Sequence, residues 1–141
     1  MKIKIKSWIF KCVAMIVLVT AIGLAMGEKA ENNDFEKALF EAASQMNKNL
    51  PMMIDSETRL DSTMASPGKI FIYSYTVVNY TIAELDVEAF TNAMRPNLVN
   101  HTKTSKDMES FRKNKVTLKY NYRDKNGREI AQITITPNDY R

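Results

Sequence analysis

One short segment places three carboxylates and a guanidinium close together. Asp55, Glu57 and Asp61 stand at even separations, with Arg59 between them. In an extended chain, residues at even separations share one face, so this segment could bind a cation or supply an acid and a base. It lacks the glycine of a calcium loop, however, and Arg59 shares its face. A solvated or salt-bridged edge strand, protected from pairing by its charges, is the favoured interpretation; a small hydrolase or metal-binding protein using Asp55–Asp61 is the alternative.

The single histidine gives little support to catalysis or metal binding. His101 has no cysteine partner, and the nearest carboxylates, Asp107 and Glu109, lie beyond a predicted turn. Metal centres and catalytic triads need several converging groups. The sequence also has no nucleophile-elbow, zinc-protease, paired-cysteine or phosphate-loop motif. We therefore expect no catalytic residue, no metal and no cofactor, and a domain that is more consistent with binding than with catalysis.

Basic residues offer a second candidate site. Residues 28–88 contain 11 acids and 5 bases, whereas residues 89–141 contain 5 acids and 11 bases. We predict that the bases around the last hairpin bind a partner, either an envelope protein or an anionic surface: Lys115, Lys119, Arg123, Lys125 and Arg128. Alternatively, the two oppositely charged halves only screen each other within one fold.

The first 27 residues are typical of a secretory signal peptide. Lys2, Lys4, Lys6 and Lys11 precede an uncharged run from Cys12 to Gly27, which is shorter than a typical membrane span. The run ends on Ala25-Met26-Gly27, so we predict cleavage after Gly27 and export to the periplasm or the medium. The alternative is an inner-membrane anchor over residues 8–26.

Removing this leader changes the charge and the thiol content of the chain. Four of the 20 basic residues lie in it, so the remaining 16 equal the 16 acids, and a neutral domain is not expected to bind nucleic acid. The only cysteine, Cys12, is also in the leader. We therefore expect a disulfide-free exported chain, with a flexible lead-in over residues 28–33 and a single domain over residues 34–141, long enough to bury its own core. The oligomeric state is left open.

Hydrophobic periodicity predicts an α+β domain. An apolar stripe predicts a helix over 34–48 with Asn33 as its N-cap. Residues 58–65 predict an edge strand and residues 70–79 a central strand. Asp86 should cap a second helix, and Pro96 should kink or split that helix. Ser105 should cap a short helix to about residue 113. A terminal hairpin turns at Asn126-Gly127. We expect helices packed on one face of a mainly antiparallel four-stranded sheet, in the order α-β-β-α-α-β-β.

Tyrosines are concentrated on the predicted strands. They could line a groove for a ligand or peptide, but the core and rim of an ordinary sheet are the favoured positions for such residues: Tyr73, Tyr75, Tyr80, Tyr120 and Tyr122.

Several segments resemble a family of small exported bacterial proteins without an established function. They are LPMMIDSETRLDS (50–62), YSYTVVNY (73–80), Arg95-Pro96, KDM (106–108), VTLKYNY (116–122) and IAQITITPND (130–139). The resemblance implies no catalytic residues. It implies that relatives have one cysteine at the position of Lys103 and another at that of Tyr140, joined in a single disulfide that this chain has lost. The resemblance therefore implies that the C-terminal strand end packs near the end of the second helix. We therefore expect an exported binding or accessory domain of the bacterial envelope.

Overall fold

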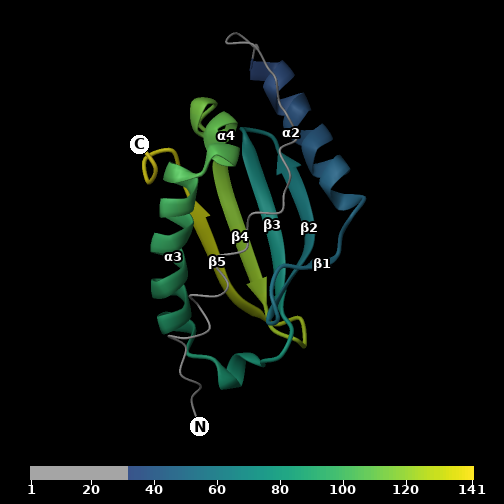
Figure 1. Ribbon diagram of the computed structural model, residues 1–141, viewed down its shortest axis with the longest axis vertical. Helices are drawn as coiled ribbons and strands as arrows, with labels where there is room; N and C mark the ends of the chain where they lie inside the picture. Colours follow the sequence, from purple (N-terminus) through teal and green to yellow (C-terminus); the bar gives the residue numbers. More distant parts are fainter. Residues whose placement is uncertain (1–31) are drawn as a thin grey trace.

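The computed structural model describes residues 32–141, so the predicted signal peptide and most of the predicted lead-in lie outside the described residues. Figure 1 shows the arrangement of the elements. In chain order they are α2 (Asn32–Asn47), β1 (Met52–Met53), β2 (Thr58–Ser66), β3 (Ile70–Val77), η2 (Ile82–Glu84), α3 (Val87–Thr104), η3 (Lys106–Met108), α4 (Glu109–Lys113), β4 (Thr117–Arg123) and β5 (Glu129–Ile135).

The strands form one mixed sheet in the order β1-β2-β3-β4-β5. The predicted α+β class is confirmed, but the predicted four-stranded, mainly antiparallel sheet differs in two respects. β1 is a fifth strand of two residues that pairs only with Leu60 and Arg59, too short to show any periodicity. β3 and β4 pair in parallel, because α3 and α4 carry the chain back to the end of the sheet at which β3 begins.

The first helix packs along β2 through the predicted apolar stripe. Phe35, Leu39 and Ala42 are buried in the core. The helix begins at Asn32 rather than at residue 34, so Asn33, predicted as the N-cap, lies within its first turn. The N-terminal end of α2 lies beside the β2–β3 turn, where the Gly68 N–H donates to Glu36 Oε1 at 3.1 Å.

The second helix begins where it was predicted to begin. Asp86 is its N-cap and accepts a hydrogen bond from the Ala89 N–H at 3.0 Å. Phe90, Met94 and Leu98 form its buried stripe. Pro96 does not split the helix, which continues to Thr104. Pro96 is exposed, and so is the residue four positions earlier; water can therefore replace the missing N–H donor at the surface.

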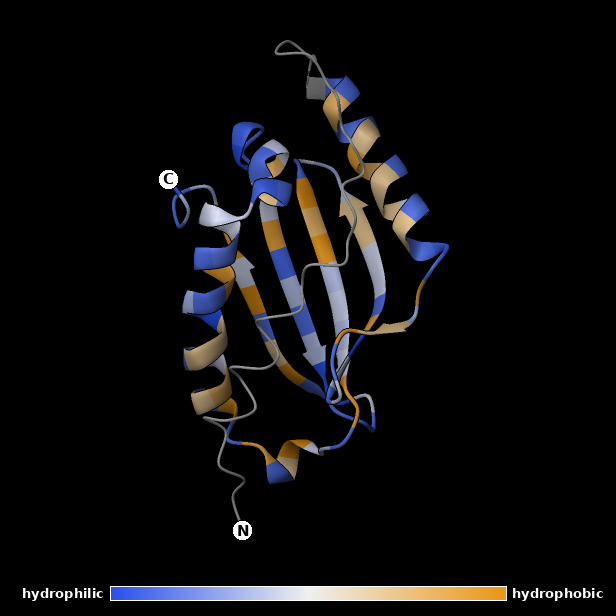
Figure 2. Ribbon diagram, in the orientation of Figure 1, coloured by the Kyte–Doolittle hydropathy of each residue, from blue (hydrophilic) through white to orange (hydrophobic). Residues whose placement is uncertain are grey.

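The two faces of the sheet differ in burial. Buried side chains alternate along β3 and β4, and Figure 2 shows the matching alternation in hydropathy. In β2 and β5 the alternation is interrupted once. Residues of α2 and α3 belong to the same core cluster as the inward side of the strands, so both helices cover one face, as predicted. No helix within residues 32–141 covers the opposite face (Figure 1), which we call the open face.

The tyrosines of the central strands belong to the core, as favoured from the sequence. Tyr73 stacks on Tyr120 with ring centroids 5.2 Å apart, and Tyr75 stacks on Tyr122 at 5.1 Å. Each pair spans the parallel β3–β4 junction. Burial raises the pKa values of Tyr73, Tyr75 and Tyr120 well above the ordinary value of a tyrosine. These rings join the two halves of the sheet.

The chain's end packs against the middle of the second helix, whereas the resemblance implied packing near the end of that helix. Arg95, near the middle of α3, bonds to Asp139 Oδ1 at 2.9 Å through Nη2. The buried Tyr140 hydroxyl donates to the Val116 carbonyl at 2.6 Å. Aromatic and hydrogen-bonded contacts thus hold the C-terminus in a chain whose only cysteine is Cys12.

Candidate functional site

The acidic segment does not form the predicted common face. Asp55 and Glu57 lie in a bend before β2 rather than in a strand. Asp55 Oδ1 accepts hydrogen bonds from the Glu57 and Thr58 N–H groups at 2.7 and 2.8 Å, so this carboxylate shapes the bend. Its other oxygen, Oδ2, is the one buried side-chain oxygen without a hydrogen-bond partner within residues 32–141.

The remaining members of the segment are held by neighbouring strands. Glu57 Oε2 accepts from Asn79 Nδ2 at 2.6 Å. Asp61 accepts from Arg59 Nε at 2.5 Å and from the Thr76 hydroxyl at 2.6 Å. These contacts match the salt-bridged edge that the sequence favoured. Among the described residues, no group of three His, Cys, Asp or Glu side chains is placed to hold a metal ion.

His101 lies half-buried in the last turn of α3. Burial lowers its pKa below the ordinary value of 6.5, and the negative charge of Asp107 partly opposes this shift. The folded protein therefore favours the neutral imidazole. The surroundings of His101 therefore bear on the stability of the helix end.

The structure separates the five predicted partner-binding residues. Lys115 precedes β4 at one end of the sheet, Lys119 lies in the middle of β4, and Arg123 ends that strand. Lys125 and Arg128 lie in the hairpin turn beyond it. At about 3.3 Å per residue, the two ends of β4 are about 20 Å apart. The five residues therefore do not form one patch, because they are spread along the full length of the hairpin.

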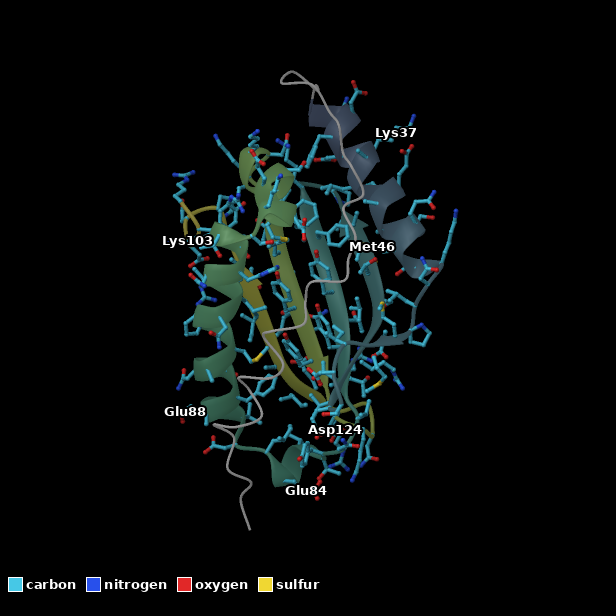
Figure 3. The ribbon with its side chains drawn as sticks, viewed as in Figure 1. Lys37, Met46, Glu84, Glu88, Lys103 and Asp124 are labelled. Carbon is cyan, nitrogen blue, oxygen red and sulfur yellow. The ribbon has the colours of Figure 1, made fainter. Side chains whose placement is uncertain are left out.

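A buried aspartate organises the turn that carries Lys125 and Arg128. Asp124 accepts hydrogen bonds from the N–H groups of Ile82, Asn126 and Arg128 at 2.8 to 2.9 Å. Its burial alone would raise the pKa, but the three backbone donors and the Arg128 charge lower it below the ordinary value. Figure 3 shows Asp124 beside Glu84 of η2, whose Oε2 lies 3.9 Å from Lys125 Nζ.

The middle of the predicted site lies on the open face. Lys119 shares a row across the sheet with Met64, Ile72 and Thr134. The next row contains small polar side chains, and its Gln132 Nε2 donates to Asn121 Oδ1 at 3.0 Å. Met64 is 57% exposed. The open face therefore combines a solvent-accessible apolar side chain with cations and neutral hydrogen-bonding groups.

Both edges of the sheet are blocked by side chains from the helices. Asn47, the last residue of α2, donates from Nδ2 to the Thr63 carbonyl and accepts from the Thr63 N–H, both at 2.8 Å. This amide occupies the two backbone groups that a neighbouring strand would use. On β5, Arg95 Nη1 donates to the Thr134 carbonyl at 2.8 Å. These contacts disfavour addition of a partner strand, since unpaired edges are what invite it.

Local periodicity gave no indication of the contacts that Asn47 and Arg95 make. Asn47 and Arg95 each contact a strand distant in the sequence, and nothing in local periodicity reports such a contact. Asp124 has a weak local signal, because an aspartate that begins a turn often accepts from nearby backbone N–H groups. Its bond to Ile82 could not be foreseen.

One of two sequence comparisons assigns the chain to a family. The model of a family described as "Domain of unknown function (DUF8479)" matches residues 34–131. The sequence matches no curated protein. The predicted resemblance to a family without an established function is thus confirmed.

Solved structures with a similar fold include three bacterial proteins. A candidate secreted protein from Pseudomonas aeruginosa has 17% identity and a TM-score of 0.63, over 80% of this chain and 100% of that one. EpsS, a pilotin of the type 2 secretion system of Vibrio vulnificus, has 10% identity and a TM-score of 0.58, over 78% and 94%. AspS, a type II secretion pilotin from Vibrio cholerae, has 15% identity and a TM-score of 0.56, over 77% and 94%. At these identities the likeness shows a shared fold.

Proposed function

The chain belongs to the DUF8479 family, and we propose that it is an exported, non-catalytic accessory domain of the bacterial envelope. In this proposal residues 1–27 direct export and are removed after Gly27, and residues 34–141 form the single domain. The domain binds a protein component of a secretion or surface apparatus. Pilotins of type II secretion systems have its fold, which supports an accessory role of this kind.

One observation carries the proposal: the likeness covers 94–100% of each of the three solved chains. Each of them therefore consists almost entirely of the fold that this chain has, and their descriptions name secretion. This coverage supports a role in which the shared fold acts as the functional unit. For this chain, we propose that the same unit presents a surface to a partner.

The chemistry of the carboxylates also supports binding over catalysis. Asp55, Asp61 and Asp124 each accept hydrogen bonds from backbone or side-chain donors that shape a bend, a strand or a turn. Carboxylates used in this way stabilise the local backbone and strand contacts. The alternative of a hydrolase based on Asp55–Asp61 therefore has no supporting geometry.

We place the partner on the open face, around Lys119 and Arg123. Both side chains belong to the outward row of β4, and neither edge of the sheet offers a free row of backbone groups near its middle. The exposed Met64 supplies apolar contact on the same face. A segment that carries acidic and apolar side chains fits this composition.

The experiment is recovery of partners from the envelope of the native bacterium. The exported form carries a C-terminal affinity tag and is cross-linked in cells, and the captured proteins are identified by mass spectrometry. A double variant, Lys119→Glu with Arg123→Glu, reverses two charges on the open face. We expect one envelope protein to be captured with the wild type and at least tenfold less of it with this variant.

A matched control reverses the same number of charges elsewhere. Lys37→Glu with Lys48→Glu changes two exposed lysines of the α2 region and should capture the same partner at wild-type yield. Equal yields from all three proteins would contradict a binding site on the open face. N-terminal sequencing of the exported form tests the proposed cleavage after Gly27, since an intact leader would favour the anchored alternative.

A further inference from the structure

Basic side chains collect at the end of the sheet where β3 and β4 begin. The Lys69 carbonyl accepts from the Thr117 N–H at 2.9 Å, and the Lys115 N–H donates to the Arg112 carbonyl at 3.2 Å. The β2–β3 turn and the connection into β4 are therefore in contact. Lys69 and Lys115 both have a left-handed backbone, with φ of 57° and 56°. Two cations from distant parts of the chain thus lie at one end.

The end of α3 and the C-terminus join the same region. Arg112 Nη1 donates to the carbonyls of Thr102 and Ser105 at 2.7 and 2.6 Å, which brings α4 against the last turn of α3. The Tyr140 hydroxyl reaches the Val116 carbonyl at 2.6 Å. We call the basic residues of this region the basic end: Lys69, Lys103, Lys106, Arg112, Lys113, Lys115 and Arg141.

Few acids balance the basic end. Its own acids are Asp107, Glu109 and the terminal carboxylate. The start of α2 adds two acids, Asp34 and Glu36, and one base, Lys37. Eight cations then face five anions. The opposite end of the sheet has the reverse composition: four bases, Arg59, Arg123, Lys125 and Arg128, are outnumbered by eight acids, Asp55, Glu57, Asp61, Glu84, Asp86, Glu88, Asp124 and Glu129. Figure 3 shows Lys37 and Lys103 toward one end and Glu84, Glu88 and Asp124 toward the other.

The two ends are too far apart to neutralise each other. They are separated by at least the length of β4, about 20 Å. The screening length at physiological ionic strength is about 8 Å. The charge separation seen between the two halves of the sequence therefore persists in the fold as a dipole along the sheet, instead of cancelling.

The described chain begins at the basic end. The first turns of α2 contact the β2–β3 turn, where the Gly68 N–H donates to Glu36, and Figure 1 shows α2 starting on that side of the sheet. The sequence that precedes Asn32 contains the apolar leader. The segment that follows the predicted leader therefore enters the domain at its basic end.

We propose that the basic end binds the anionic phospholipid surface of the envelope and leaves the acidic end directed away from it. This inference uses the export step of the proposed function and does not depend on the protein partner at the open face. Each basic residue held near an anionic bilayer strengthens binding by about fivefold. Loss of three such charges should then weaken binding by roughly a hundredfold.

The test uses the exported form, residues 28–141, because the core cluster lies entirely within residues 35–140. Its sedimentation with vesicles of phosphatidylcholine is compared with that using vesicles containing about one quarter phosphatidylglycerol, at low and physiological salt. We expect binding only to the anionic vesicles, decreasing with salt. Absence of binding to them at low salt would overturn the proposal and leave an acidic protein face as the partner of the basic end.

Two triple variants with equal net charge separate position from total charge. Lys103→Gln, Lys106→Gln and Lys115→Gln remove three charges from the basic end, and we expect roughly a hundredfold weaker binding. Arg123→Gln, Lys125→Gln and Arg128→Gln remove three from the acidic end, and we expect less than about a threefold change. Equal losses in both would contradict an oriented contact. Circular dichroism checks that both variants are folded.

Orientation can also be measured directly, because the exported form has no cysteine of its own. Thr104→Cys and Asn126→Cys place a nitroxide at exposed positions on opposite ends of the sheet. On anionic vesicles, the label at Thr104 should become protected from a water-soluble relaxation agent, while the label at Asn126 should stay accessible. Equal protection of both labels would overturn the proposed orientation.

Discussion

Replacing Asn47 by alanine tests whether one amide protects the outer edge of β2. The Asn47 side chain bonds to both backbone groups of Thr63 at 2.8 Å. Its oxygen also lies 3.1 Å from the Thr63 hydroxyl, which donates to the Ala43 carbonyl at 3.2 Å and so keeps a partner in the variant. The substitution thus removes two hydrogen bonds and leaves the α2 backbone in place.

The expected loss follows from these two bonds. Each neutral hydrogen bond contributes about 1 kcal/mol to the free energy of unfolding, which gives about 2 kcal/mol. Alanine forms helix more readily than asparagine, so at the last helical position the substitution adds about 0.5 kcal/mol to the free energy of unfolding. The net expectation is a free energy of unfolding lower by about 1.5 kcal/mol. For a domain of this size, that corresponds to a Tm lower by about 6 °C.

Urea unfolding of the exported form, followed by far-ultraviolet circular dichroism, measures this change. Ser44→Ala, an exposed position of the same helix, is the control and should be neutral or slightly stabilising. Asn47→Asp keeps the acceptor and loses the donor, so its stability should fall by about 1 kcal/mol. If Asn47→Ala stays within about 0.5 kcal/mol of the wild type, water replaces the amide at no cost and the edge-protection argument is wrong.

Three further substitutions probe other contacts. Tyr140→Phe leaves the Val116 carbonyl without its donor at 2.6 Å and should lower the free energy of unfolding by about 1 to 2 kcal/mol; no change in chemical denaturation would contradict this. Gly127→Ala places a Cβ in open space but at φ of 80°, so only backbone strain acts, and the cost should be about 1 kcal/mol. Burial lowers the pKa of His101 below 6.5. Its stabilising contribution is therefore complete above pH 6.5 and is lost as the pH falls toward the folded value, so His101→Asn should flatten the fall in Tm below pH 6.5.

Local patterns predicted the elements that depend on neighbouring residues. The apolar stripe of α2, the Asp86 cap and the Asn-Gly hairpin are all determined within a few residues, and the structure has each of them. The two-residue β1 and the parallel pairing of β3 with β4 were missed. Both depend on contacts between segments distant in the sequence, which no short window contains.

The candidate site was harder to predict than the fold. Charge composition showed that the second half of the sequence is basic, but assigning its bases to one hairpin assumed that residues close in sequence form one surface. β4 instead carries Lys115 and Arg123 to opposite ends of the sheet. The segments that carry Lys69 and Lys103, which no pattern connected with Lys115, meet the connection into β4 at the basic end, through the bonds of Thr117 to Lys69 and of Arg112 to Thr102.

The parallel junction of β3 and β4 also has a consequence for how the chain folds. The β2–β3 and β4–β5 pairs are hairpins of adjacent strands, whereas β3 can join β4 only after residues 78–116 close a long loop. Such a step follows local hairpin formation. The stacked pairs Tyr73–Tyr120 and Tyr75–Tyr122 form only at that step. Since the one tryptophan, Trp8, lies in the predicted leader, tyrosine emission from residues 28–141 would follow the joining of the two hairpins in real time.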